Sequence, residues 1–395
     1  MTAPDTPKTA QAHPTTGRTW IREQFPILDQ GLYLNHAAIA PWPRCTADAI
    51  QTFGQENTLK GPVGYRDWIV REKELRRSLA RLTGADSEDD IALLKNTTEG
   101  ISLVAWGLDW QAGDNIVLPR DEFPSNRLPW LAQSAHGVEI REVDIRTAEG
   151  AENALLAAMD SNTRLLSVSA VQWNDGLRLD LETLGKACRA KSVLFFVDAI
   201  QQLGALPVDV ETCHVDFLAA DAHKWLLGPE GIAVFYCRAS ARPRLRLVQQ
   251  GWHMFDNPWN FHRREWEPST SAKRFEAGSP NSMGQAALHA SLKLLLKTGM
   301  EQVSGQILQN TAFLINALPL IAGVQITSRT EPERRSGIVS FTHESIPSAT
   351  LNTRLAEAGV TCAVRGHSIR LSPHFYQDET ELAQFIQILE RVLSG

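Results

Sequence analysis

The runs S-V-L-F-F-V-D (residues 192–198) and V-D-F-L-A-A-D-A-H-K-W (residues 215–225) decide the expected fold. Each contains a short, almost continuous apolar stretch, which is typical of a strand buried on both faces of a parallel sheet. Similar runs lie at 115–119 and 164–171, and L-E-T-L-G-K-A-C-R-A-K (181–191) has the pattern of a crossover helix. This alternation predicts an α/β fold with a large, doubly wound, mostly parallel sheet.

The pattern changes after about residue 240. An aromatic and basic segment without a clear period is followed by an amphipathic helix at 282–299 and then by alternating short strands and helices. We therefore expect a disordered tail at residues 1–18, a large domain at 19–280 and a small C-terminal α+β domain at 281–395. The N-terminal segment of the large domain is expected to contribute to the small one.

Composition excludes several classes of function. The 395 residues carry a formal net charge of -6 and no basic run, so neither nucleic acid nor a membrane surface is an expected partner. There is no apolar stretch of membrane-spanning length and no signal peptide, which favours a cytoplasmic protein. The five cysteines lack C-x-x-C spacing and the histidines do not cluster, so no metal site and no disulfide framework are expected. Nucleotide-binding, zinc-protease and serine-hydrolase motifs are absent.

Chemically active residues stand where the predicted strands end. Asp198 closes one strand and Lys224 follows the next, while Thr97-Thr98-Glu99-Gly100 opens a helix after another. Ligands bind beyond the carboxyl ends of strands in such sheets, and helix N-termini bind phosphate. A desolvated lysine becomes nucleophilic, and a buried aspartate requires a positive partner. Each residue also has an ordinary explanation, as a helix cap, a solvated turn lysine or a capping sequence. Together they suit pyridoxal 5'-phosphate (PLP).

The sequence resembles the class V aminotransferases of PLP fold type I, which include cysteine desulfurases, isopenicillin N epimerase-like proteins and C–S lyases. The resemblance runs from Y-L-N-H-A-A (33–38) to S-P-H-F-Y (372–376) and includes V-D-A-I-Q-Q-L-G (197–204), D-A-H-K-W-L-L-G-P-E-G (221–231) and R-F-E-A-G-S-P-N (274–281). It implies the PLP-dependent transferase fold type I.

The resemblance also implies roles at the cofactor. Lys224 would form the Schiff base, Asp198 would pair with the pyridine nitrogen, and Gln201 would bind the phenolic oxygen. Asn174 would contact the ring oxygen or the substrate carboxylate. Phe123, in E-F-P-S-N (122–126), stands where desulfurases carry a histidine over the ring; it can stack but cannot relay a proton.

Further matched residues concern the phosphate and the substrate. His223, Thr97 and Thr98 would bind the phosphate, and Ser279 would reach the phosphate of a neighbouring subunit, which implies a homodimer. Arg370 would grip the α-carboxylate of an amino acid substrate, a task that suits its bidentate fork.

Two departures bear on the reaction. The desulfurase loop R-x-G-H-H-C reads V-R-G-H-S-I-R (364–370) here and has no cysteine, and Cys362 does not match the missing position. Asp221 stands where many relatives have a serine beside the phosphate; a carboxylate there would be repelled unless it points away, so Asp221 is left out of the expected site.

The function expected first is therefore a PLP-dependent enzyme that acts at Cα of an amino acid through Lys224, as an aminotransferase or an epimerase. A PLP-dependent C–S β-lyase without a persulfide cysteine is the alternative within the same family. Two further alternatives are not enzymes: a non-catalytic PLP-binding scaffold, and an unrelated α/β binding protein whose motifs match by chance.

Overall fold

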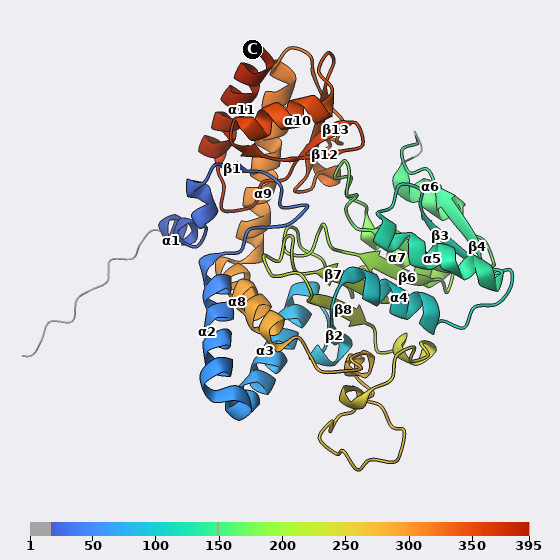
Figure 1. Ribbon diagram of the computed structural model, residues 1–395. Helices are drawn as coiled ribbons and strands as arrows, with labels where there is room; N and C mark the ends of the chain where they lie inside the picture. Colours follow the sequence, from blue (N-terminus) through green and yellow to red (C-terminus); the bar gives the residue numbers. More distant parts are fainter. Residues whose placement is uncertain (1–16, 148–149, 395) are drawn as a thin grey trace, which may run out of the picture.

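The fold consists of a large sheet unit and a smaller unit above it (Figure 1), in a computed structural model that describes residues 17–147 and 150–394. The expected tail at residues 1–18 lies outside the described residues except for Gly17 and Arg18, with which helix α1 (Gly17–Glu23) begins. The large sheet has seven strands, in the order β2 (Ile91–Leu94), β8 (Ala233–Cys237), β7 (Phe217–Asp221), β6 (Leu194–Asp198), β5 (Thr163–Ser169), β3 (Asn115–Pro119) and β4 (Glu139–Val143).

The strands from β7 to β4 run parallel, and β8 runs antiparallel to both β7 and β2. This confirms the mostly parallel α/β sheet. The register places Asp198 beside Ala219 and beside Ser169. Asp198 and Asp221, which end β6 and β7, therefore lie at the same edge of the sheet.

Alternate residues of β6 show how the two faces of the sheet are covered. Phe195 and Val197 belong to one core, and Leu194 and Phe196 belong to another. Successive side chains of a strand point to opposite faces, so each core lies on one side. The helices that contribute to the first core are α1, α3 (Tyr65–Thr83), α6 (Ala151–Ala157), α7 (Leu181–Ala190), α8 (Ser282–Thr298) and the first half of α9 (Met300–Ala317). The second contains α4 (Thr97–Gly107) and Trp130 of the short helix α5 (Leu128–Leu131).

The small unit contains a four-stranded antiparallel sheet, ordered β12 (Ala363–Arg365), β13 (Ser368–Leu371), β10 (Val339–His343) and β9 (Val324–Ile326). Its core also takes residues from α9 (Met300–Ala317), α10 (Ser348–Glu357) and α11 (Glu379–Ser394). Leu32 of β1 (Leu32–Tyr33), which pairs with β11 (Val360–Thr361), joins the same core.

Helix α8 belongs with the large unit although it follows residue 281, where the small domain was expected to begin. It packs against α2 (Arg44–Lys60) and α3, and its Leu288, Leu292 and Leu295 join the core of the large sheet. Val303 and Ile307 of α9 join that core as well, and α9 enters the separate small core only at Leu314. The amphipathic pattern of α8 shows a buried face but does not say which core that face joins.

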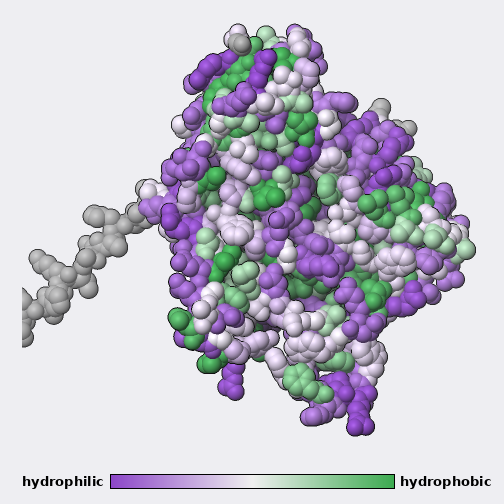
Figure 2. Space-filling view, viewed as in Figure 1, coloured by the Kyte–Doolittle hydropathy of each residue, from purple (hydrophilic) through white to green (hydrophobic). Residues whose placement is uncertain are grey.

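Hydrophilic side chains cover most of the face in Figure 2, and hydrophobic ones gather there in small separate groups. The aromatic segment between β8 and α8 forms the loop that projects at the bottom of Figure 1, with Trp259, Phe261 and Trp266 exposed. In the described ranges, every helix is too short or too polar to cross a lipid bilayer.

Candidate active site

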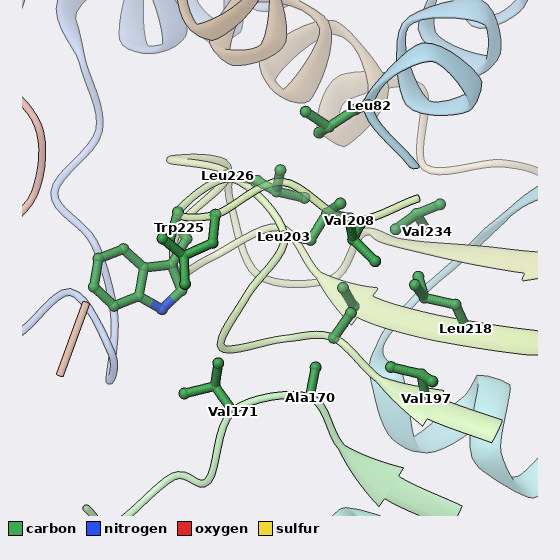
Figure 3. Close-up of a cluster of buried hydrophobic side chains, with 14 of the residues drawn as sticks. Leu82, Ala170, Val171, Val197, Leu203, Val208, Leu218, Trp225, Leu226 and Val234 are labelled. Atoms are coloured by element: carbon green, nitrogen blue, oxygen red, sulfur yellow. The ribbon is translucent and has the colours of Figure 1, made fainter. Parts of the chain in front are cut away.

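Lys224 lies in a tight turn that follows β7 at the carboxyl edge of the large sheet. The turn is closed by the N–H of Gly228, which donates to the carbonyl of Ala222 (2.9 Å), and by the N–H of Leu227, which donates to the carbonyl of Lys224 (3.1 Å). Trp225 and Leu226, both fully buried, anchor the turn on the apolar cluster shown in Figure 3. This packing fixes a lysine that is only 9% exposed.

The ammonium form of Lys224 is disfavoured. Burial lowers the pKa of Lys224 to about 8, and the positive charge of Arg370 acts in the same direction. Asp198 and Asp221 oppose this shift. An uncharged amine is the nucleophilic form, so about a tenth of Lys224 is reactive at pH 7 and about half near pH 8, far more than for an exposed lysine.

Asp198 is a buried carboxyl group at the tip of an apolar strand. One of its oxygens accepts a hydrogen bond from the N–H of Ile200 (3.0 Å). Burial raises the pKa of Asp198 to about 6, although Ile200 and Lys224 both favour the charged form. A protonated pyridine nitrogen is the kind of partner that would keep this carboxylate ionised.

The ring of Phe123 faces the lysine. Nζ of Lys224 lies 5.6 Å from the ring centroid, and Trp173 packs edge-on against the same ring at 5.6 Å between centroids. Phe123 is 40% exposed, which leaves part of its ring free to stack on a ligand.

Asp221, which the sequence analysis left out of the expected site, points towards the N-terminus of α4. Its Oδ1 accepts a hydrogen bond from the N–H of Thr97 (2.9 Å), and its own N–H donates to the Thr97 hydroxyl (3.0 Å). Thr98, the next residue, is exposed and donates from its hydroxyl to Ser125 (2.9 Å). Asp221 therefore lies at the helix end that the sequence analysis assigned to the phosphate, where the helix dipole attracts its carboxylate.

His223 lies beside Asp221, with 3.6 Å between its Nδ1 and Oδ2 of the carboxyl group. Burial and the charge of Lys224 lower the pKa of His223 to about 4, so the imidazole is neutral at physiological pH. It can offer a hydrogen bond to a phosphate but no positive charge.

Gln201 is held by the protein on both ends of its amide. Its Nε2 donates to the carbonyl of Ala37 (2.9 Å), and its Oε1 accepts from the indole N–H of Trp225 (2.9 Å). Since Nε2 carries two hydrogens, one donor is left for a cofactor oxygen.

Arg370 of β13 is almost fully buried at 1% exposure, yet it is only partly paired. Its Nη1 donates to the carbonyl of Trp173 (2.6 Å), whereas Nε and Nη2 have no partner among the described residues. Burial lowers the pKa of Arg370 to about 9, and the neighbouring Arg365 acts in the same direction. The β12–β13 register places both arginines on the same face of the hairpin. Two unpaired donors on a buried guanidinium call for an anion such as a carboxylate.

Two predicted residues have other contacts. Oδ1 of Asn174 accepts from Arg146 (3.1 Å), and the Asn174 carbonyl accepts from the hydroxyl of Ser340 (2.7 Å), which ties it to the small sheet. Ser279 is exposed in the loop before α8 and shares a cleft with Glu99 and Gln249. No hydrogen bond joins it to the predicted site residues in the part of the chain that the structure describes.

Sequence reasoning missed Glu122, which is buried next to Phe123. Glu122 accepts hydrogen bonds from the N–H (2.6 Å) and the hydroxyl of Ser169 and from the amide of Gln172 (3.2 Å). Burial raises the pKa of Glu122 to about 7, and Asp198 adds to the shift. Its position directly before Phe123 was the only signal in the sequence.

A second missed group links the two units behind Lys224. His36 contacts Tyr376 (Nε2 to Oη, 2.5 Å) and the Ser372 carbonyl (2.8 Å), and His374 contacts the Trp225 carbonyl (3.2 Å). All these side chains are buried, so the network fixes the N-terminal segment and the small unit against the lysine turn.

Comparison with known proteins places this geometry in context. The model of the family described as Aminotransferase class-V matches residues 32–385. A probable cysteine desulfurase of Methanothermobacter thermautotrophicus is 28% identical over 94% of this chain and 97% of its own length. An uncharacterized aminotransferase of Bacillus subtilis is 28% identical over 92% of this chain and 95% of its own.

Among solved structures, the cystine C–S lyase C-DES in complex with its product cysteine persulfide is 26% identical, with a TM-score of 0.87 over 93% of this chain and 99% of that one. A lysine-to-alanine mutant of the same lyase, with glycine covalently linked to its PLP cofactor, has a TM-score of 0.86 at 26% identity, over 93% of this chain and 98% of that one.

Proposed function

The chain belongs to the class V aminotransferase family of PLP-dependent enzymes, and we propose that it cleaves the C–S bond of a cysteine-type amino acid by β-elimination. The observation that carries the amino acid part of the proposal is Arg370, whose two unpaired donors are buried near the depressed-pKa amine of Lys224. An α-amino acid presents a carboxylate that Arg370 can bind and a Cα proton that Lys224 can remove.

The residues fit PLP. Lys224 supplies an amine with a lowered pKa, Asp198 a buried carboxylate, Phe123 a ring face, and Thr98 a backbone N–H at a helix N-terminus. When bound, PLP withdraws electrons from Cα of the amino acid and so makes its proton acidic. Asp198 would hold the proton of the pyridine nitrogen, and Gln201 would donate to the ring oxygen.

The remaining steps belong to the protein. Arg370 would hold the carboxylate and so orient the Cα–H bond towards Nζ of Lys224, which takes the proton as general base. The Cβ–S bond then breaks, and sulfur leaves with the bonding electron pair and receives a proton from Lys224. Hydrolysis of the remaining three-carbon fragment gives pyruvate and ammonia.

Two observations favour elimination with release of the sulfur product over persulfide transfer. The β12–β13 turn, Arg365 to Ser368, contains no cysteine. Cys362 precedes it, but burial raises the pKa of its thiol to about 12, and its Sγ donates to Oδ1 of Asn352 (3.3 Å). Such a thiol is a poor nucleophile. The similarity to a cystine C–S lyase points the same way.

Transamination is the second candidate, and epimerisation the third. Lys224 alone would suffice for the proton transfer of transamination, which runs from Cα to the carbon on the other side of the substrate nitrogen, whereas two-base epimerisation needs an acid opposite Lys224. Phe123 supplies no such group. One relative of similar identity is named as an aminotransferase.

The deciding experiment incubates the PLP-loaded protein with cystine, cysteine and a panel of other amino acids, with and without a keto acid acceptor. β-Elimination predicts pyruvate, ammonia and a sulfur product without an acceptor. Product that forms only when the acceptor is present would overturn elimination in favour of transamination, and loss of chirality alone would favour epimerisation.

We also propose that the chain acts as a homodimer in which Ser279 completes the phosphate site of the partner. Ser279 is exposed in a loop and has no hydrogen bond to the described site residues around Lys224. Mixing Lys224→Ala and Ser279→Trp proteins tests this: restored activity in the mixture supports a shared site, and a monomeric mass in sedimentation contradicts it.

A further inference from the structure

We propose that Asp221 couples cofactor binding to a proton: its carboxyl group adjoins the place that we assign to the PLP phosphate, and tight binding requires this group to be neutral. The inference rests on the cofactor site proposed above. It makes Asp221 a positioning residue, which acts on the phosphate rather than on the reacting atoms.

The carboxyl group is fixed by two reciprocal hydrogen bonds. Oδ1 accepts from the N–H of Thr97 (2.9 Å), and the Asp221 N–H donates to the hydroxyl of the same threonine (3.0 Å). These bonds join the end of β7 to the first residue of α4, so Asp221 cannot move aside without breaking the strand–helix contact.

Asp221 thereby occupies the N–H of Thr97, a donor that an anion bound at this helix end would otherwise use. The side chain of Asn96 caps the N–H of Glu99 (2.8 Å). The N–H of Thr98 has no hydrogen-bond partner among the described residues and, with the imidazole of His223, is left for the phosphate, whereas the Thr98 hydroxyl donates to Ser125 (2.9 Å). A phosphate held by these groups lies directly beside the carboxyl group of Asp221.

The charges around Asp221 do not offset the negative charge of a phosphate bound beside an ionised carboxyl group. Burial raises the pKa of Asp221 to about 7, partly opposed by the Thr97 hydrogen bond, while Asp198 and Glu230 add to the rise and Lys224 opposes it. His223, the nearest side chain of the turn, is neutral because its pKa is lowered to about 4. A phosphate monoester carries nearly two negative charges at neutral pH. Binding it next to Asp221 therefore favours uptake of a proton by the carboxyl group.

The consequence is a dependence of affinity on pH. Below the pKa of Asp221 the carboxyl group is neutral, and its O–H can donate a hydrogen bond to a phosphate oxygen. Above it, each bound phosphate requires one proton from solution, so the dissociation constant of PLP rises by up to about tenfold per pH unit.

The test measures PLP binding to the apo-protein from pH 6 to pH 9 by quenching of tryptophan fluorescence. Wild type is compared with Asp221→Asn, which keeps an acceptor for Thr97, and with Asp221→Ser. Pyridoxal, which lacks the phosphate, is titrated in parallel. We expect the affinity of wild type for PLP to fall at least about tenfold more between pH 7 and pH 9 than that of either variant. No such difference is expected for pyridoxal.

Parallel pH profiles of wild type and Asp221→Asn would overturn the proposal, and so would an equal difference with pyridoxal. Circular dichroism spectra and thermal unfolding verify that both variants fold. If Asp221→Asn does not fold, Asp221→Ser takes its place in the comparison. Failure of wild type to bind PLP at any pH would instead overturn the proposed function, and this inference with it.

Discussion

Nζ of Lys224 lies 5.6 Å from the centroid of the Phe123 ring, at the edge of the sheet where β6 and β7 end. The two residues have different roles, stacking for Phe123 and proton transfer for Lys224. Phe123 offers an apolar face without a titratable group, and Lys224 is the residue of the pair that can carry a proton. A ligand that stacks on Phe123 is thus presented to a single base.

Removal of the Phe123 ring tests its stacking role. Phe123→Ala should weaken PLP binding by about 2- to 13-fold, because an aromatic stacking contact contributes about 0.5–1.5 kcal/mol. Phe123→Tyr keeps the ring and is the matched control, with affinity near that of wild type. Titration of both apo-proteins with PLP checks this, and equal affinities of the alanine and tyrosine variants would refute stacking.

The reactivity of Lys224 should depend on pH in a way that ordinary lysines do not show. Burial lowers the pKa of Lys224 to about 8 from 10.5, so half of its amine is uncharged near pH 8. The rate at which the apo-protein reacts with pyridoxal should rise with pH and reach half its maximum there. The absorbance of the pyridoxal adduct provides the measurement, with Lys224→Ala as the blank.

Arg370→Gln supplies a second check on the same rate profile. Because the Arg370 charge helps to lower the pKa of Lys224, its removal should move the midpoint to higher pH. An unchanged midpoint would show that the Arg370 charge does not contribute to the lowered pKa of Lys224.

The sequence predicted those parts of the site that follow from local patterns. Continuous apolar runs located β6 and β7, and their ends located Asp198 and Lys224. The orientation of Asp221 could not be predicted, because it depends on Thr97, a residue 124 positions away that only the packing of α4 brings close. The partners of Gln201 and the buried position of Glu122 depend in the same way on contacts between segments that no local pattern encodes.

The fold also has features that local patterns predict and features that depend on packing between distant segments. The βαβ alternation predicted the parallel sheet, since each strand and helix carries its own periodicity. The packing of α8 on α2 and α3 was not predictable from its amphipathic face, because any apolar core of suitable shape can cover such a face.

Arg370 should control affinity for the substrate carboxylate. Arg370→Lys removes the planar fork and should raise KM by about 10- to 100-fold, since a charge-assisted pair of hydrogen bonds contributes about 1.5–3 kcal/mol. PLP binding should change little, which separates loss of substrate binding from loss of the cofactor. Steady-state kinetics with an amino acid and with its decarboxylated amine make the comparison, and an equal effect on both would contradict carboxylate recognition.

Cys362 should be dispensable for sulfur release. Its thiol is partly buried and donates to Asn352, and burial raises its pKa to about 12. Near pH 8 only about one molecule in 10⁴ would then carry the thiolate, which is the form that attacks sulfur. Cys362→Ser should retain sulfide and pyruvate release within about twofold of wild type, as should the control Cys45→Ser. Mass spectrometry after turnover with cysteine provides the second measurement. A persulfide on Cys362, together with loss of sulfide release in Cys362→Ser, would show that the turn between β12 and β13 rearranges to expose this thiol, and the reaction would then be sulfur transfer rather than elimination.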